Sequence, residues 1–98
     1  MKLIDQDQLN TIKIHIYTHG RLLERKIFSH VFEGAPIDGV ISALAAYQNP
    51  DGGFGNGLEP DLMCPSSSAI GAESALTVLD LIGHPVLEII EPLEKWFQ

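Results

Sequence analysis

The acidic residues that follow a glycine-rich stretch are the side chains of this sequence best suited to chemistry. Glu59 and Asp61 flank Pro60, and Asp51 and Asn56 are close by. Two neighbouring carboxylates can act as general acid and general base, as in glycoside hydrolysis. A calcium loop is a second use, but the spacing fits no EF-hand pattern. The favoured interpretation is a solvated loop whose acids cap turns and the next helix.

Two histidines and one cysteine complete the set of candidate residues. His15 and His19 are one turn apart if their segment is helical, a spacing that suits two metal ligands. No glutamate lies between them in the metalloprotease pattern and no third ligand is evident, so we expect surface histidines and no metal site. Cys64 has no histidine beside it in the sequence to activate it as a nucleophile, which favours a buried or incidental thiol.

The composition is typical of one soluble globular domain covering residues 1–98, with 45% hydrophobic and 19% charged residues. Thirteen acidic against six basic residues give a net charge of −7, which disfavours binding to nucleic acid. We expect no membrane span, because no apolar run is long enough. Asp5 and Asp7 interrupt any signal-peptide core, and the single cysteine favours a reducing compartment, so a cytoplasmic location is expected.

Proline and glycine divide the chain into helical segments. The first extends from Asp5 or Asp7 to about His19 and is ended by Gly20. Residues 11–17 alternate with a period of two and are rich in β-branched side chains, which indicates a strand. The residues on either side tolerate a helix well, and we therefore favour the helix.

The second and third helices lead into a long loop. Residues 21–33 carry an apolar stripe and end at Gly34, and a third helix begins near Pro36 and reaches Tyr47. Residues 49–66 hold four glycines and three prolines, which excludes a helix or an ordinary strand. A loop of this length in a small domain is usually functional or held by its own contacts.

Two more helices follow the loop. One of the serines at 66–68 caps the fourth helix, and Gly83 ends it. Apolar residues cover most of its circumference, which predicts burial on more than one side. The last helix opens at Pro85 and extends to Gln98, with Pro92 either bending or restarting it.

A shift of fifty residues aligns the sequence partly with itself. Tyr47-Gln48 falls on Phe97-Gln98 at one helix end, and Val31-Phe32 falls on Leu81-Ile82 at another. This pattern predicts helical-hairpin repeats with a period near fifty. The loop at 49–66 follows the first copy and the sequence stops after the second, so we expect an N-terminal piece of a longer protein, with apolar edges open to self-association.

Residues 48–55, Gln-Asn-Pro-Asp-Gly-Gly-Phe-Gly, resemble the repeat signature of the prenyltransferase and squalene-cyclase superfamily. Leu44 stands four residues before Gln48, as in the Gln–Trp-type motif of that family, and Phe54 stands where terpene cyclases usually carry tryptophan. The substitution is more similar to the repeats of protein prenyltransferases. The resemblance covers about residues 37–83 and implies an all-α fold of helical hairpins that forms part of an α/α toroid.

The same motif also has a direct physical interpretation. Gln48, at a helix end, can donate and accept hydrogen bonds at once and so tie the loop to the exposed N–H groups of the next helix. Asp51 followed by Gly52-Gly53 predicts a tight turn, and Phe54, just before Gly55, is expected to anchor the loop on the core. We therefore interpret these residues as a structural motif rather than a catalytic one.

The resemblance implies a prenyltransferase-like or terpene-cyclase-like repeat protein that binds an isoprenoid or another apolar small molecule in its complete ring. The sequence contains neither the aspartate-rich motif of terpene cyclases nor the Asp, Cys and His zinc set of protein prenyltransferases, so no catalytic motif, metal or cofactor is expected here. Two alternatives stay open. One is a carbohydrate-active α/α-toroid enzyme that uses Glu59 and Asp61, and the other is a non-catalytic scaffold or partner-binding repeat.

Overall fold

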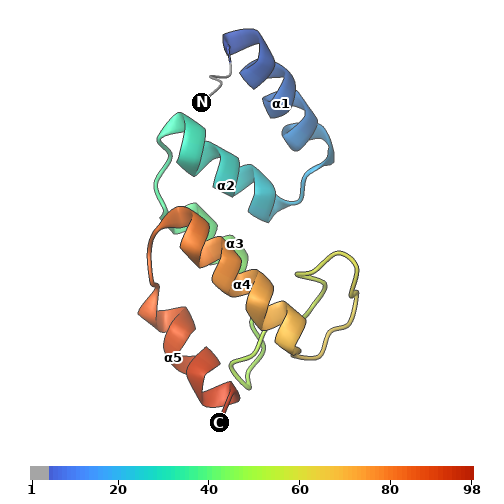
Figure 1. Cartoon of the computed structure of the whole chain (residues 1–98), viewed down its shortest axis with the longest axis vertical. Coiled ribbons are helices and arrows are strands. Elements are labelled where there is room, and N and C mark those ends of the chain that lie inside the picture. Colours follow the sequence, from blue (N-terminus) through green and yellow to red (C-terminus); the bar gives the residue numbers. More distant parts are fainter. Residues whose placement is uncertain (1–4) are drawn as a thin grey trace. The chain divides into compact units, whose positions relative to one another are not determined.

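The computed structural model describes residues 5–98 and is all-helical over that range (Figure 1). Its only β-type pairing among these residues is an isolated antiparallel bridge between Gln48 and Phe54. The five helices are α1 (Gln6–His19), α2 (Leu22–Glu33), α3 (Asp38–Ala45), α4 (Ala69–Ile82) and α5 (Leu87–Trp96). The predicted all-α class is confirmed.

Helix α1 settles the ambiguous segment at 11–17 in favour of a helix. Its first turn is held by a capping box, in which the Gln8 N–H donates to Asp5 Oδ1 at 2.8 Å and the Asp5 N–H donates to Gln8 Oε1 at 3.0 Å. The helix ends as predicted at Gly20, whose N–H donates to the Ile16 carbonyl. This local capping outweighs the strand propensity of the β-branched residues.

Glycines in the left-handed conformation end two further helices at the predicted positions. Gly34 follows α2 with φ of 71°, and Gly83 follows α4 with φ of 67°. At the other end of α4, Ser68 is the capping serine, because its Oγ accepts a hydrogen bond from the Gly71 N–H at 2.9 Å.

Two helices differ from their predicted extent. Helix α3 ends at Ala45 rather than Tyr47, and the chain turns there because the Tyr47 and Gln48 N–H groups bond to carbonyls three residues earlier. Helix α5 continues through Pro92, so this proline does not restart a helix, and Val86 rather than Pro85 is the residue before the first turn.

The chain forms two compact units, Met1–Val40 and Ile41–Gln98, which are described separately. In the first unit, α1 contacts α2 through the Tyr17 ring, which meets Phe28 edge-on with 6.2 Å between ring centroids. The Tyr17 hydroxyl also lies 2.5 Å from Ser29 Oγ, and Lys13 forms an ion pair with Glu33.

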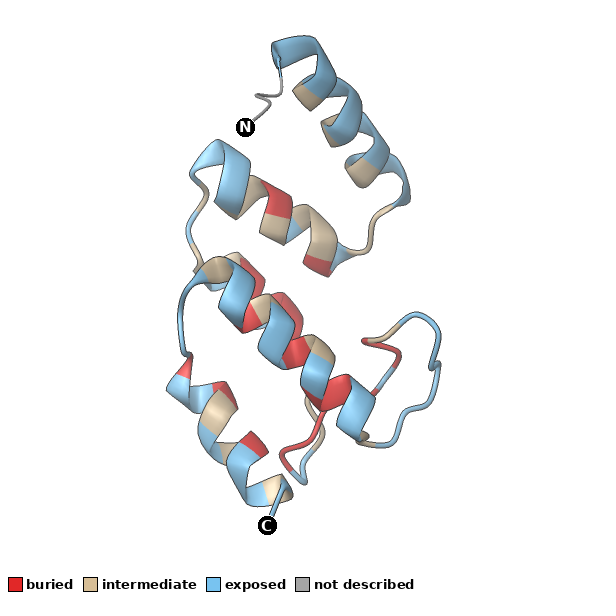
Figure 2. Cartoon of the chain, viewed as in Figure 1, coloured by how far each residue is buried: buried red, intermediate tan, exposed pale blue. Residues whose placement is uncertain are grey.

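The second unit holds most of the buried apolar side chains, on α3, α4, α5 and the loop between α3 and α4 (Figure 2). Within this unit the buried hydrophobic residues are Ala43, Leu44, Phe54, Leu58, Ala72, Ala75, Leu79, Val86, Ile89 and Leu93. A loop residue, Phe54, is among the largest fully buried side chains, so the loop is part of the core.

Helix α4 buries one face only, which makes the prediction of burial on several sides wrong. The buried positions are Gly71, Ala72, Ala75 and Leu79, a single helical stripe. Ile70, Leu76 and Leu81 lie outside this stripe and are 50%, 42% and 60% exposed. Helix α4 carries more apolar residues than α5 and the loop can cover, so some of them stay exposed.

Among the helices of the described range, none combines the length and the apolar character needed to cross a membrane.

Candidate functional site

The glycine-rich loop is closed at its base by backbone hydrogen bonds. The Asn49 N–H donates to the Gly53 carbonyl at 2.8 Å, and the Gly52 N–H donates back to the Asn49 carbonyl at 2.9 Å. A third bond joins the Gly55 N–H to the Tyr47 carbonyl at 3.1 Å. Residues 49–53 therefore form the tight turn expected from the Asp-Gly-Gly sequence.

Gln48 joins this turn to α5 through one amide group. Its Nε2 donates to the Gly52 carbonyl at 2.9 Å and to the Ile89 carbonyl at 3.1 Å. The expected partners were N–H groups at the start of the next helix, so this expectation is wrong. A backbone carbonyl has two lone pairs, so the Ile89 carbonyl can accept this bond although it lies within α5.

Three glycines in or beside the loop lie so close to a backbone carbonyl of another segment that no side chain would fit. A Cβ atom on Gly52 would stand 2.0 Å from the Pro92 carbonyl oxygen, and one on Gly55 would stand 2.2 Å from the Ser66 carbonyl oxygen. A Cβ atom on Gly71, at the start of α4, would stand 2.1 Å from the Phe54 carbonyl oxygen. The loop thus packs backbone against backbone on both α4 and α5.

Asp51 and Asn49 fasten the turn to the residues before α4. Asp51 Oδ1 accepts from the Gly53 N–H at 2.9 Å and from Ser67 Oγ at 2.7 Å. The Asn49 amide donates to the Pro65 carbonyl at 2.9 Å and to Ser67 Oγ at 3.0 Å. The hydrogen bond from Ser67, followed by that from Gly53, holds the pKa of Asp51 below its usual value.

The two candidate carboxylates, Glu59 and Asp61, lie in one turn of the loop. Glu59 is half-buried, and its Oε1 accepts from the Asp61 N–H at 3.4 Å while its Oε2 accepts from Ser74 Oγ at 3.3 Å. Asp61 is exposed. Glu59 therefore holds its own turn and contacts α4, as expected for a loop whose acids cap local structure.

None of the remaining sequence candidates is among the residues of this hydrogen-bond network. The rings of His15 and His19 are 4.8 Å apart on exposed positions of α1. Within residues 5–98, no group of three potential ligands could hold a metal ion. Cys64 is exposed, which excludes the buried alternative and leaves the incidental thiol, and it lies in a segment with no regular structure.

Two side-chain clusters are absent from the sequence interpretation. The first joins α1 to α2: the Tyr17 hydroxyl and Ser29 Oγ both bond to Glu33 Oε1, at 3.1 and 3.3 Å. The hydrogen bond from Lys13 is the main cause that lowers the pKa of Glu33. The residues of this cluster are up to twenty positions apart in the sequence, so no local sequence pattern predicts it.

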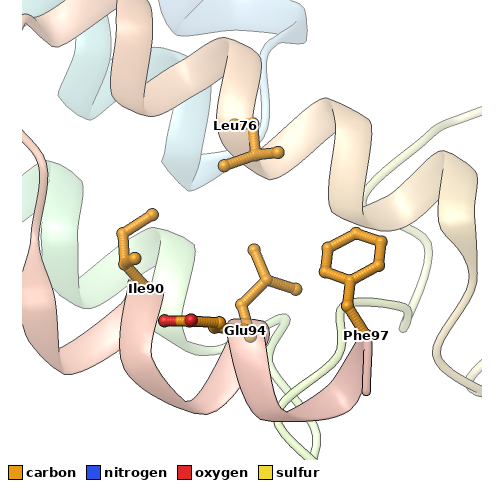
Figure 3. Close-up of a pocket in the computed structure, with 5 residues that line it drawn as sticks. Leu76, Ile90, Glu94 and Phe97 are labelled. Carbon is orange, nitrogen blue, oxygen red and sulfur yellow. The ribbon is translucent and has the colours of Figure 1, made fainter.

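The second cluster is a shallow apolar groove of about 230 Å³ between α4 and α5 (Figure 3). Leu76 of α4 faces Ile90 and Phe97 of α5 across it, and Leu93 and Glu94 complete the lining. Positions 90, 93, 94 and 97 follow the i, i+3, i+4, i+7 pattern of one helical face, and this signal was available in the sequence.

A Gln48→Glu substitution tests the amide contact. A carboxylate at this position cannot donate and faces two carbonyl oxygens, so we expect a loss of about 1–3 kcal/mol in the free energy of unfolding at pH 7. These carbonyls raise the pKa of the new acid above its unfolded value, and the penalty falls as pH drops below that raised pKa. Urea unfolding at pH 7 and pH 4 measures both effects.

Gln98→Glu is the matched control, because Gln98 is exposed at the end of the same unit. It is expected to change the free energy of unfolding by less than about 0.5 kcal/mol at either pH. Equal losses in the two variants would show that the donor function of Gln48 is unimportant.

Comparison with known proteins adds no relative: no protein-family model matches the sequence, and neither a curated protein nor a solved structure matches the chain significantly. The function must therefore be inferred from two features of the structure. The first is a loop whose motif residues join its backbone to that of the neighbouring helices, and the second is an apolar groove between α4 and α5.

Proposed function

We propose that this chain is a cytoplasmic helical-hairpin repeat protein of the prenyltransferase and squalene-cyclase type, which binds an isoprenoid or a similar apolar molecule within an α/α toroid. The observation that carries the proposal is the use of the Gln–Asp–Gly–Gly–Phe motif as a connector. Gln48 and Asp51 direct their polar atoms to the loop, to α5 and to Ser67, and Phe54 is fully buried. The motif therefore holds repeats together and leaves binding to other surfaces.

The helix spacing supports a repeat. Gly34 and Gly83 end α2 and α4 in the same left-handed conformation, 49 residues apart. The helices that follow them begin at Asp38 and Leu87, again 49 residues apart. Two successive hairpins with the same stop and the same connection length fit the predicted period near fifty.

Apolar surface supports a hydrophobic ligand. Leu76 and Phe97 are 42% and 59% exposed and border a groove with almost entirely apolar walls. Neither Glu59 nor Asp61 lines this groove. The carbohydrate-enzyme alternative has no comparable support, because the contacts of Glu59 are structural.

A non-catalytic scaffold is the second candidate, and one observation favours it. The groove of about 230 Å³ is smaller than the roughly 300–1,000 Å³ of typical small-molecule pockets. In that case the exposed apolar side chains would serve protein contacts rather than a ligand.

Binding of farnesol, a fifteen-carbon isoprenoid alcohol, tests the proposal. The single tryptophan, Trp96, contacts the Phe97 ring at 5.0 Å between centroids, so its fluorescence reports on this helix pair. We expect saturable binding of farnesol with a rise in melting temperature, because a ligand that prefers the folded state stabilises it. Maltotetraose is the control and is expected to leave both signals unchanged.

Each other outcome has a defined meaning. Saturable binding of maltotetraose, lost in Glu59→Gln and Asp61→Asn, would replace the proposal with the carbohydrate enzyme. Binding of neither compound to the folded chain would contradict an apolar ligand and leave the scaffold.

A further inference from the structure

The apolar groove has a definite construction. Leu93, which is buried, lines the groove, and Leu76 and Phe97 lie on opposite sides of it (Figure 3). Its volume of about 230 Å³ is too small for a typical drug-sized ligand but suits a few inserted side chains. A hydrophobic groove between two helices can receive the apolar face of an amphipathic helix.

One carboxylate lines this groove, and others lie within a helical turn of its lining residues on both helices. On α4, Glu73 precedes Leu76 by three residues and Asp80 follows it by four, so all three share one face, and all are exposed. On α5, Glu94 lines the groove and the exposed Glu91 lies one turn before it. In the described range the ion pairs join Lys13 to Glu33 and Arg21 to Glu24, in the other unit.

The charge of the chain is concentrated in the unit that carries the groove. Ile41–Gln98 contains eight acidic residues and one lysine, a net charge of −7, whereas Met1–Val40 contains five acidic and five basic residues. The whole net charge of the protein therefore belongs to the second unit. Such an excess attracts cationic partners and repels anionic ones.

This charge selects among the possible occupants. A second copy that docked groove to groove would bring together two units of −7 each, and like charges across an interface cost several kcal/mol. An anionic lipid surface is repelled in the same way. A partner helix with apolar side chains on one face and basic residues around them complements both the apolar lining of the groove and the carboxylates beside it.

We propose that the groove between α4 and α5 is a docking site for an amphipathic helix of a partner protein, whose apolar side chains insert between Leu76 and Phe97 and whose lysine or arginine residues pair with Glu73, Asp80, Glu91 and Glu94. The apolar ligand of the proposed function draws on the same groove, so the two proposals are separated by their probes. Farnesol is uncharged, whereas helix docking depends on the charge of the peptide.

Two designed peptides test the site on the full chain. The first is a helical peptide of about 18 residues, long enough to form a helix, with leucines at i, i+3, i+4 and i+7, flanking lysines and no tryptophan. The second has glutamate at every lysine position. Titration calorimetry and Trp96 fluorescence are expected to show binding of the lysine peptide at least about tenfold tighter than that of the glutamate peptide, with weakening at high salt.

Variants on α4 locate the binding. Leu76→Gln is expected to weaken the lysine peptide at least about tenfold, because it places an amide in the apolar lining. Leu81→Gln is the matched control on the same helix, because Leu81 is also exposed but does not line the groove, and it is expected to leave the affinity unchanged. Glu73→Gln with Asp80→Asn should reduce both the affinity and its salt dependence.

Circular dichroism of each variant separates lost binding from lost folding. Equal affinity for the two peptides, absence of binding to the folded chain, or an equal loss in Leu76→Gln and Leu81→Gln would overturn the proposal. Light scattering of a dimer that Leu76→Gln converts to a monomer would overturn it in favour of a second copy.

Discussion

A Phe54→Ala variant is expected to lose about 3–5 kcal/mol in the free energy of unfolding of the second unit. Phe54 is fully buried although it lies in a loop, and its backbone carbonyl accepts the Ser68 N–H at 3.0 Å just before α4. Removal of the ring leaves a cavity at the point where the loop and α4 meet. The free energy of unfolding of a small domain is only about 5–15 kcal/mol, so this loss is a large part of its stability.

Denaturant unfolding followed by Trp96 fluorescence measures this loss, because Trp96 lies in the same unit. Phe54→Leu keeps most of the volume and is expected to cost less than about 1.5 kcal/mol, which keeps the test usable if the alanine variant does not fold. Leu81→Ala is the control in the same unit, since Leu81 is 60% exposed, and should cost below about 1 kcal/mol. Similar losses for Phe54→Ala and Leu81→Ala would contradict the anchoring role.

A Gly52→Ala variant is expected to be the most damaging single-methyl change in the loop. Gly52 has φ of 91°, which an L-residue rarely adopts, and the added Cβ would lie 2.0 Å from the Pro92 carbonyl oxygen. The left-handed conformation costs about 1–2 kcal/mol. Displacement of the loop from α5 costs about 1–3 kcal/mol more.

Gly83→Ala separates the two contributions. Gly83 has φ of 67°, but nothing lies within 4 Å of its would-be Cβ. It should therefore show only the conformational cost, about 1–2 kcal/mol. Urea unfolding of the two variants gives the difference directly, and equal losses would show that the loop does not depend on close contact with α5.

The sequence was sufficient for features set by near neighbours. Asp5, Ser68, Gly34 and Gly83 begin or end helices through bonds to residues within a few positions, and these boundaries agree with the structure. The tight turn after Gln48 is local in the same way. Capping and turn chemistry are properties of short segments, so a single sequence contains them.

Features that need distant partners could not be predicted. Nothing near Gln48 indicates that its amide reaches Ile89, 41 residues further on, and that contact also accompanies the continuation of α5 through Pro92. Similarly, the apolar pattern of α4 does not reveal which of its faces stays uncovered. Residue type and closeness in the sequence identify the candidate carboxylates. The hydrogen bond from Ser74 to Glu59, however, depends on how the loop folds back onto α4.

The different sequence separations within the loop network set an order for its formation. The bonds among residues 47–55 close rings of only a few residues and cost little chain entropy, whereas the contacts with Ile89 and Pro92 must wait for a segment some forty residues later. During synthesis the turn can therefore form before α5 leaves the ribosome. The loop then serves as a template, and α5 is the last piece to settle onto a surface that already exists.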